Sequence, residues 1–260
     1  MTTQASIDTS HGRVSYGESG SGAPLVILHS LLTDRGAFDV VIPSLPGRVI
    51  ALDLPGYGLS DKGATSIEAF ADQMAAAVAE ICDEPATVMG NGLGAFVALG
   101  LAIRHPDLVS RLVLVGAGAT FPEPARPAFA NMAQLVTTSG MSAVTPTALR
   151  RIFTDDFLET HPEETAERVR VLEAADPEVF VAACLALQEV DFTDGASDLA
   201  IPTLIVVGEE DQATPPAMAA TLDGLLPDSR VVVLPGIAHA PQLQDPDGFI
   251  QTISSFLEGE

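Results

Sequence analysis

Short continuous runs of apolar residues recur along the chain, and segments whose apolar positions have helical spacing separate them. Continuous runs are typical of strands buried on both faces of a sheet, and the helical segments between them predict right-handed crossovers and a mostly parallel sheet. The expected strands are 24–29, 48–52, the start of 87–97, 111–115, 202–208 and 230–234. The expected helices are 35–44, 66–81 with Ser66 as N-cap, the end of 87–97 continuing to Ala102, 215–226 and 247–257.

Two segments depart from this alternation. Residues 4–18 alternate loosely around the turn signal Ser10-His11-Gly12, which predicts an antiparallel hairpin with His11 exposed. Residues 118–198 have helical spacing, several prolines and no strand-like run, which predicts a lid of short helices. The predicted fold class is therefore α/β, with a core formed by 1–117 and 199–260, helices on both faces of the sheet and a helical lid formed by 118–198.

The composition fits a globular protein with a strongly acidic surface. Apolar residues make up 47% of the chain, and 35 Asp and Glu against 12 Lys and Arg give a formal net charge of −23. Such a charge repels nucleic acid and anionic membranes, so the expected partner is a small molecule. The expected oligomeric state is a monomer or a homodimer. The apolar runs are far shorter than the roughly 20 residues of a membrane span, and no signal peptide is visible, which predicts a cytoplasmic protein.

The two cysteines do not indicate a metal site. Cys82 and Cys184 lie in apolar helical patterns and lack a metal-ligand spacing such as C-x-x-C. We expect buried free thiols and no bound metal.

The stretch Gly90-Asn91-Gly92-Leu93-Gly94 has the spacing of a nucleophile elbow, in which a strand turns sharply into a helix and exposes a Ser, Cys or Asp. In this chain Gly92 occupies the position of the nucleophile. Glycine relieves a backbone strain of about 1–3 kcal/mol at such a turn, so a protein without catalytic activity would be stabilised by it. The missing side chain also leaves room for about one water molecule.

The same glycines satisfy the dinucleotide-binding pattern G-x-G-x-x-[GA]. An acidic residue after the next strand would support that alternative, because it would hold the ribose. The stretch 115–118 contains no acidic residue, and the strand before the glycines is not the first of the chain. The pattern therefore lacks its confirming features.

Two loops that follow late strands carry titratable groups. Asp211 lies in the loop after strand 202–208, and His239 lies in the loop after strand 230–234. Ligands of open α/β sheets bind at the carboxyl ends of the strands, so both groups should meet the elbow. The chain order of elbow, acid and histidine is that of the α/β-hydrolase triad. Glu209 and Glu210 are alternatives for the acid.

With these residues in place, the whole chain resembles proteins of the α/β-hydrolase-fold superfamily. Within that superfamily it is similar to 3-oxoadipate enol-lactonases and related lactone or ester hydrolases. The segments that carry the resemblance are Leu28-His29-Ser30-Leu31, Asp53 to Ser60, Ile103-Arg104-His105-Pro106, Gly208 to Pro215 and Gly236 to His239. Gly92 is the departure, because the pattern of the family has serine there.

The resemblance implies roles for four residues and no cofactor. Asp211 would orient His239 and stabilise its protonated form. The backbone N–H groups of Leu31 and Leu93 would form an oxyanion hole, which does not depend on side chains.

Other residues are candidate substrate contacts. His29 shapes the loop before Leu31 or titrates in catalysis, and Ser30 is either a replacement nucleophile or the small polar residue that the resemblance places there. Basic residues gather in the lid at Arg150, Arg151, Arg168 and Arg170. One of them, with Arg150 and Arg151 as the main candidates, can pair with a substrate carboxylate, or all four balance acidic neighbours at the surface.

The sequence thus predicts a cofactor-free hydrolase of a small ester or enol-lactone that uses His239 and Asp211 without a serine nucleophile. A His–Asp dyad can act as general base on water with no covalent intermediate. Three alternatives stay open: an inactive homologue that acts as a binding protein, a lyase or isomerase that uses His239 as general base, and a laboratory Ser-to-Gly variant of a serine hydrolase.

Overall fold

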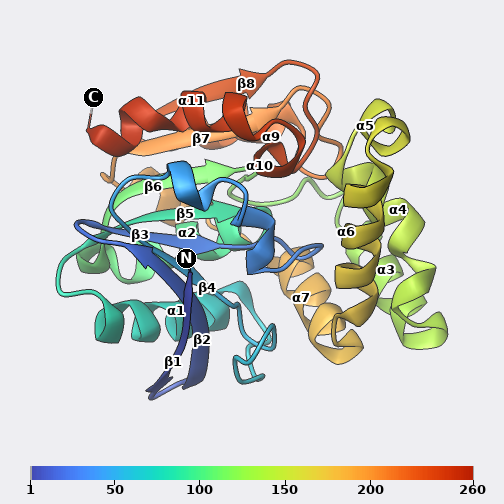
Figure 1. Cartoon of the computed structure of the whole chain (residues 1–260), viewed down its shortest axis with the longest axis horizontal. Coiled ribbons are helices and arrows are strands. Elements are labelled where there is room, and N and C mark those ends of the chain that lie inside the picture. The colour runs from blue at the N-terminus through green and yellow to red at the C-terminus, as the bar shows by residue number, and fades with distance from the viewer. Residues whose placement is uncertain (1, 260) are drawn as a thin grey trace.

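A single eight-stranded sheet runs through the computed structural model, which describes residues 2–259 (Figure 1). The strands are β1 (Thr3–Thr9), β2 (Gly12–Gly20), β3 (Pro24–Leu28), β4 (Arg48–Leu52), β5 (Ala86–Asn91), β6 (Val109–Val115), β7 (Thr203–Gly208) and β8 (Ser229–Leu234). Their order is β1-β2-β4-β3-β5-β6-β7-β8. The strands from β3 to β8 pair in parallel, whereas the N-terminal hairpin pairs antiparallel. The predicted α/β fold class is confirmed, and so is the hairpin, with His11 exposed at its turn.

Helices cover both faces of this sheet (Figure 1). The helices of the core are α1 (Ile67–Ile81), α2 (Leu93–Arg104), α9 (Pro216–Asp223), α10 (Pro241–Gln244) and α11 (Pro246–Glu258), with short 3-10 helices η1 (Arg35–Phe38), η2 (Ile42–Ser44) and η3 (Pro106–Leu108). Successive strand residues face opposite sides, so Leu28 packs with α1 and α2 while Ile27 packs with η1 and α11. The Ser66 side chain caps α1 as expected, by accepting from the N–H of Ala69.

The predicted helix at 35–44 is wrong. The segment forms two separate short 3-10 helices, η1 and η2, instead of one α-helix. Gly36 and Pro43 explain the difference, because glycine weakens a helix and proline removes a backbone donor. Cys184 is buried in α7, but Cys82 is only half-buried and lies just after α1; both are free thiols.

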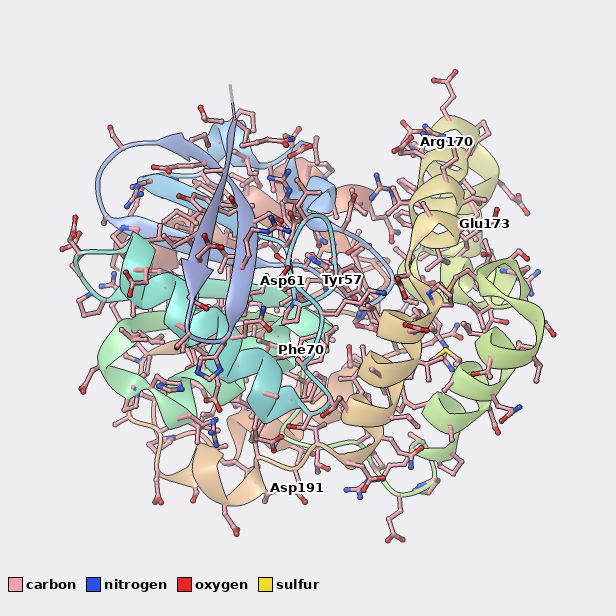
Figure 2. The ribbon with its side chains drawn as sticks, turned by 90° about the horizontal axis from the view of Figure 1, so that it is seen from below. Tyr57, Asp61, Phe70, Arg170, Glu173 and Asp191 are labelled. Atoms are coloured by element: carbon pink, nitrogen blue, oxygen red, sulfur yellow. The ribbon has the colours of Figure 1, made fainter. Side chains whose placement is uncertain are left out.

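The segment between β6 and β7 is helical. It contains α3 (Pro127–Ser139), η4 (Met141–Ala143), α4 (Thr145–Ile152), α5 (Asp155–Thr160), α6 (Pro162–Ala174), α7 (Pro177–Glu189) and α8 (Thr193–Ser197). Its two ends meet where Thr120 bridges to Asp191. Figure 2 shows Asp191 at that end and Arg170 at the outer end, away from the sheet. We call residues 118–198 the helical insertion. Within residues 2–259, no helix is long and apolar enough to cross a membrane.

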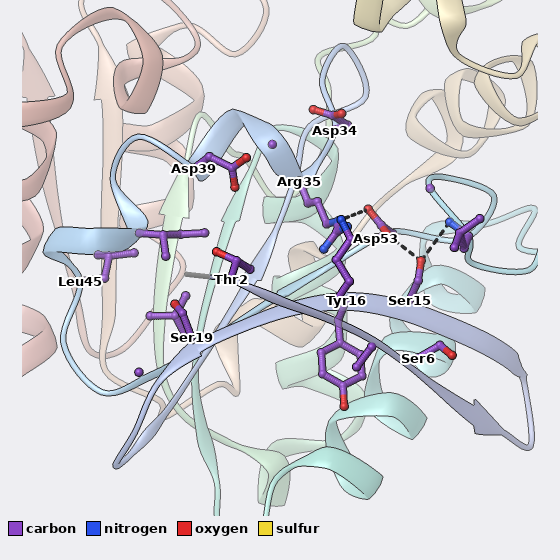
Figure 3. A pocket seen from close by; sticks show the side chains of 18 of the residues that line it. Thr2, Ser6, Ser15, Tyr16, Ser19, Asp34, Arg35, Asp39, Leu45 and Asp53 are labelled. Atoms are coloured by element: carbon purple, nitrogen blue, oxygen red, sulfur yellow. Dashed lines mark hydrogen bonds and ion pairs between the residues drawn. The ribbon is translucent and has the colours of Figure 1, made fainter.

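A buried ion pair fixes the loops beside β2 and β4. Arg35 Nε lies 3.1 Å from Asp53 Oδ1, and the hydroxyl of Ser15 donates to Asp53 Oδ2 at 2.6 Å (Figure 3). The Ser15 hydroxyl also accepts from the N–H of Leu59 at 3.0 Å. The Asp53 side chain is only 4% exposed, so these partners replace the water that would otherwise bind its oxygens.

This ion pair generates a stability prediction. Arg35→Met should lower the free energy of unfolding by about 3 kcal/mol, because it leaves the Asp53 carboxylate buried without its cation. Arg13→Met is the matched control, since Arg13 pairs with Asp61 at 3.6 Å where both side chains are about half exposed, and it should cost under about 1 kcal/mol. Urea unfolding of both variants checks the difference, and equal costs would contradict it.

Candidate active site

A tight turn joins β5 to α2 at Gly92. The backbone angles of Gly92 are φ 54° and ψ −118°, a conformation that residues with a side chain rarely adopt. A Cβ on Gly90 would lie 2.2 Å from the Gly94 carbonyl oxygen, and a Cβ on Gly94 would lie 2.2 Å from the Leu28 carbonyl oxygen. The three glycines therefore permit a strand-to-helix turn that packs directly against β3.

Two polar side-chain atoms face the space beside Gly92. A Cβ on this residue would lie 2.5 Å from Ser30 Oγ and 2.6 Å from His239 Nε2. Both distances are shorter than van der Waals contact, so the hydroxyl and the imidazole occupy part of the volume that a side chain would need. The imidazole reaches this space from the loop after β8, as the sequence predicted.

Asp211 holds the other nitrogen of this imidazole. His239 Nδ1 lies 2.8 Å from Asp211 Oδ2, and both side chains are buried. Asp211 also accepts from the hydroxyl of Thr214 at 2.8 Å and from the N–H groups of Ala213 and Thr214 at 2.8 and 2.9 Å. Glu209 instead accepts from the N–H of Gly236 at 3.1 Å. Of the three candidate acids, Asp211 is therefore the one hydrogen-bonded to His239.

This arrangement keeps the Asp211 carboxyl group ionised. Burial raises the pKa of Asp211, but the attraction of His239 and the hydrogen bonds from His239 and Thr214 outweigh it, so the pKa lies below its ordinary value. The ionised carboxylate accepts the Nδ1–H of His239. The lone pair of Nε2 is then directed to the space beside Gly92, as a general base requires.

Further groups that the sequence analysis did not single out hold His239 in place. The amide of Asn91 donates to the His239 carbonyl oxygen at 2.9 Å, and Gln242 donates to Asn91 Oδ1 at 3.1 Å. Gly116 has φ 60°, and a Cβ there would lie 2.8 Å from His239 Nδ1. In the sequence, only the position of Asn91 between two elbow glycines could have indicated a role in the site. Gln242 and Gly116 gave no such signal, because their contacts join distant parts of the chain.

The two backbone N–H groups expected in the oxyanion hole are free to bind a ligand. Leu93 begins α2, whose N-terminus carries partial positive charge, and Leu31 lies in the loop after β3. Within the described residues, neither N–H has an acceptor. The hydroxyl of Tyr57 donates to the Leu31 carbonyl oxygen at 3.2 Å and so helps to fix this loop.

His29 has a structural role in the same loop. Burial lowers the pKa of His29, so its imidazole is neutral. Its Nδ1–H donates to the Ser30 carbonyl oxygen at 2.9 Å, and its Nε2 accepts from the N–H of Leu54 at 3.1 Å. Both nitrogens are thus occupied, which leaves none for a substrate and joins the loops after β3 and β4.

A small cavity of about 40 Å³ opens beside Gly92 and His239. Its walls are mostly apolar, and the helical insertion supplies Phe121, Phe129, Met132, Arg151 and Leu187. Phe121 stacks on Phe96 at 4.9 Å between ring centroids and meets Phe129 edge-on at 4.7 Å. The insertion therefore covers His239. The larger groove of Figure 3, about 1100 Å³, lies under the N-terminal hairpin and includes neither Gly92 nor His239.

The two candidate arginines of α4 point to different places. Arg151 lines the cavity with His239. Arg150 is exposed, 4.0 Å from Asp155. Within residues 2–259, no cluster of three or more His, Cys, Asp or Glu side chains is arranged to hold a metal ion.

Comparisons with known proteins agree with this architecture. The family model described as alpha/beta hydrolase fold matches residues 23–246. A pimeloyl-[acyl-carrier protein] methyl ester esterase of Neisseria meningitidis is 32% identical over 247 residues, which cover 90% of this chain and 76% of that protein.

Two solved structures are similar over almost their whole length. The enol-lactonase from Burkholderia xenovorans LB400 has a TM-score of 0.92 and 25% identity, and the match covers 98% of this chain and 100% of the other. A thermophilic esterase from Thermogutta terrifontis, in a structure with malate bound, has a TM-score of 0.89 and 26% identity, with 98% of each chain covered. Since the family model spans most of the chain, and relatives match it nearly end to end, the chain belongs to the alpha/beta hydrolase fold family.

Proposed function

We propose that this protein is a cofactor-free hydrolase of small esters or lactones in which His239 acts as a general base without a serine at the elbow. One observation carries the proposal: Nε2 of an imidazole held by Asp211 faces the space where a Cβ of residue 92 would lie, at 2.6 Å. A water molecule in the adjoining cavity, which Ser30, Gly92 and His239 line, can donate to His239 Nε2.

The proposed reaction has two steps. The water oxygen bonds to the carbonyl carbon of the substrate while a water proton passes to Nε2 of His239. The carbonyl oxygen becomes an oxyanion that accepts from the N–H groups of Leu31 and Leu93. The bond from carbon to the leaving oxygen then breaks, and the leaving alcohol takes the proton from His239. Asp211 stabilises the imidazolium between the steps.

The expected rate is modest. In triad hydrolases that lack one triad member, the remaining groups still give roughly 10³–10⁴-fold acceleration over water. Such a rate suits activated esters and enol-lactones. The cavity of about 40 Å³ is also smaller than a typical ligand pocket of roughly 300–1,000 Å³, so substrate entry requires the apolar side chains of the helical insertion to move apart.

The buried dyad favours catalysis over a purely binding role. Asp211 has a fully buried side chain, and a buried carboxylate is costly unless hydrogen bonds satisfy it. Four donors from His239, Ala213 and Thr214 satisfy it here. A binding protein would gain as much stability from an apolar residue at this position, whereas a general base needs the carboxylate.

Removal of the base is the direct test. His239→Ala should lower turnover of enol-lactones and phenyl esters by about 10²–10⁴-fold, the usual contribution of general base catalysis. His11→Ala, at the exposed hairpin turn, is the control and should leave turnover unchanged. The measurement is the initial rate of product formation. Turnover that does not depend on His239 contradicts the proposal, and ligand-induced thermal stabilisation without any product favours a binding protein.

Substitution of Gly92 tests the use of the adjacent space. Gly92→Ala should lower turnover at least about tenfold, because its methyl group fills the position beside His239 Nε2. Gly92→Ser carries the same backbone strain, about 1–3 kcal/mol, but brings a hydroxyl to the base, so it should give faster turnover than alanine and a burst of acyl-enzyme. Ser30 must rotate to admit either side chain. Wild-type turnover in Gly92→Ala would contradict a reactive group in this space.

A further inference from the structure

A guanidinium group lines the proposed catalytic cavity. Arg151 reaches it from α4, and the other charged or titratable side chain in the wall is His239. The rest of the wall is apolar side chains, glycine and the hydroxyls of Ser30 and Thr214. The cavity therefore contains a permanent cation and no acidic side chain.

Three of the other four arginines of the helical insertion have acidic partners, whereas Arg126 donates to the Phe121 carbonyl oxygen and to the Thr120 hydroxyl. Arg150 lies 4.0 Å from Asp155, and Arg170 pairs with Glu167. Arg168 is buried 3.6 Å from Asp34. These three side chains balance acidic neighbours, which leaves Arg151 as the arginine of this group that faces the cavity.

Arg151 itself has no carboxylate partner among residues 2–259, since no ion pair within 4.0 Å includes it. Its one recorded side-chain contact of hydrogen-bond type is from Nη1 to Met132 Sδ at 3.9 Å, and a thioether is a weak acceptor. Within the described residues, Arg151 lacks a carboxylate partner although the chain has 35 acidic residues against 12 basic ones. A half-buried guanidinium beside apolar walls also pays a desolvation cost.

We infer that Arg151 binds a carboxylate of the substrate, so that the substrate class is an anionic ester or lactone, such as a half-ester of a short dicarboxylic acid. This inference rests on the proposed hydrolysis at His239. A guanidinium forms two parallel hydrogen bonds with a carboxylate, which would both hold the substrate and orient its ester group toward His239. Once the apolar side chains of the helical insertion have moved apart to admit the substrate, they can contact the methylene chain between the two groups.

The alternative is that Arg151 only packs beside Met132. A packing role would make no distinction between charged and neutral substrates. The preference for an anionic over a neutral ester therefore separates the two explanations.

The experiment compares monophenyl glutarate with phenyl pentanoate, a neutral activated ester of similar length, each corrected for its uncatalysed hydrolysis. Arg151→Met should reduce the ratio of kcat/KM for the anionic ester to that for the neutral ester by about 10- to 100-fold, because it removes a charge-assisted bidentate contact. Arg150→Met is the matched control: the same change one residue earlier on α4, at an exposed side chain, should leave the ratio unchanged. Arg151→Lys keeps the charge without the planar fork and should recover part of the preference.

Calorimetric binding of glutarate gives a readout that does not need turnover. Wild type and Arg150→Met should bind it, and Arg151→Met should bind it at least tenfold more weakly. An unchanged ester ratio together with unchanged glutarate binding in Arg151→Met overturns the role of Arg151, even where hydrolysis still depends on His239. Absence of turnover for both esters, with glutarate binding that depends on Arg151, overturns the proposed hydrolysis and keeps the carboxylate site.

Discussion

The hydrogen bond between Asp211 and His239 is the interaction on which the rest of the site depends. It places an ionised carboxylate in a dry environment, and it determines which imidazole nitrogen faces Gly92. Such a pair is stable only where other donors complete the carboxylate, which explains the convergence of the Ala213 and Thr214 N–H groups and the Thr214 hydroxyl on Asp211. The loops after β7 and β8 are thereby held at one edge of the sheet.

The same edge explains why the glycines occur where they do. The His239 ring can approach the ends of β5 and β6 because Gly92 and Gly116 have no Cβ. Both adopt positive φ, so each glycine also permits the turn in which it lies. At Gly92 the two effects act together: the fold retains a sharp strand-to-helix turn without strain, and the imidazole moves close to the backbone. Asn91, in the middle of this turn, ties the carbonyl group of His239 to the same strand end.

Much of the fold could be predicted because burial on both faces of a parallel sheet leaves continuous apolar runs. The order of elbow, acid and histidine along the chain also predicts that three loops meet at one edge of the sheet, because each loop follows a parallel strand. What the sequence did not reveal depends on tertiary placement. Gly36 and Pro43 interrupt the one helix that local periodicity suggested, and the packing of Phe38 and Ile42 against the sheet, which the sequence does not show, adds to their effect. Arg150 and Arg151 are adjacent and chemically identical, and only the rotation of α4 separates a surface ion pair from a cavity wall.

Charge acts on two length scales in this protein. The net charge of −23 produces a long-range field that opposes the approach of anions, but salt screens that field over about 8 Å at physiological ionic strength. Inside the cavity the mostly apolar walls leave room for little water or salt that would screen Arg151. An anion that has crossed the acidic surface therefore meets a stronger and more local attraction than the repulsion it left behind. Under the proposed function, the acidic surface should affect mainly the rate at which an anionic substrate arrives, whereas the spacing of Arg151 and His239 within the cavity would select between substrates.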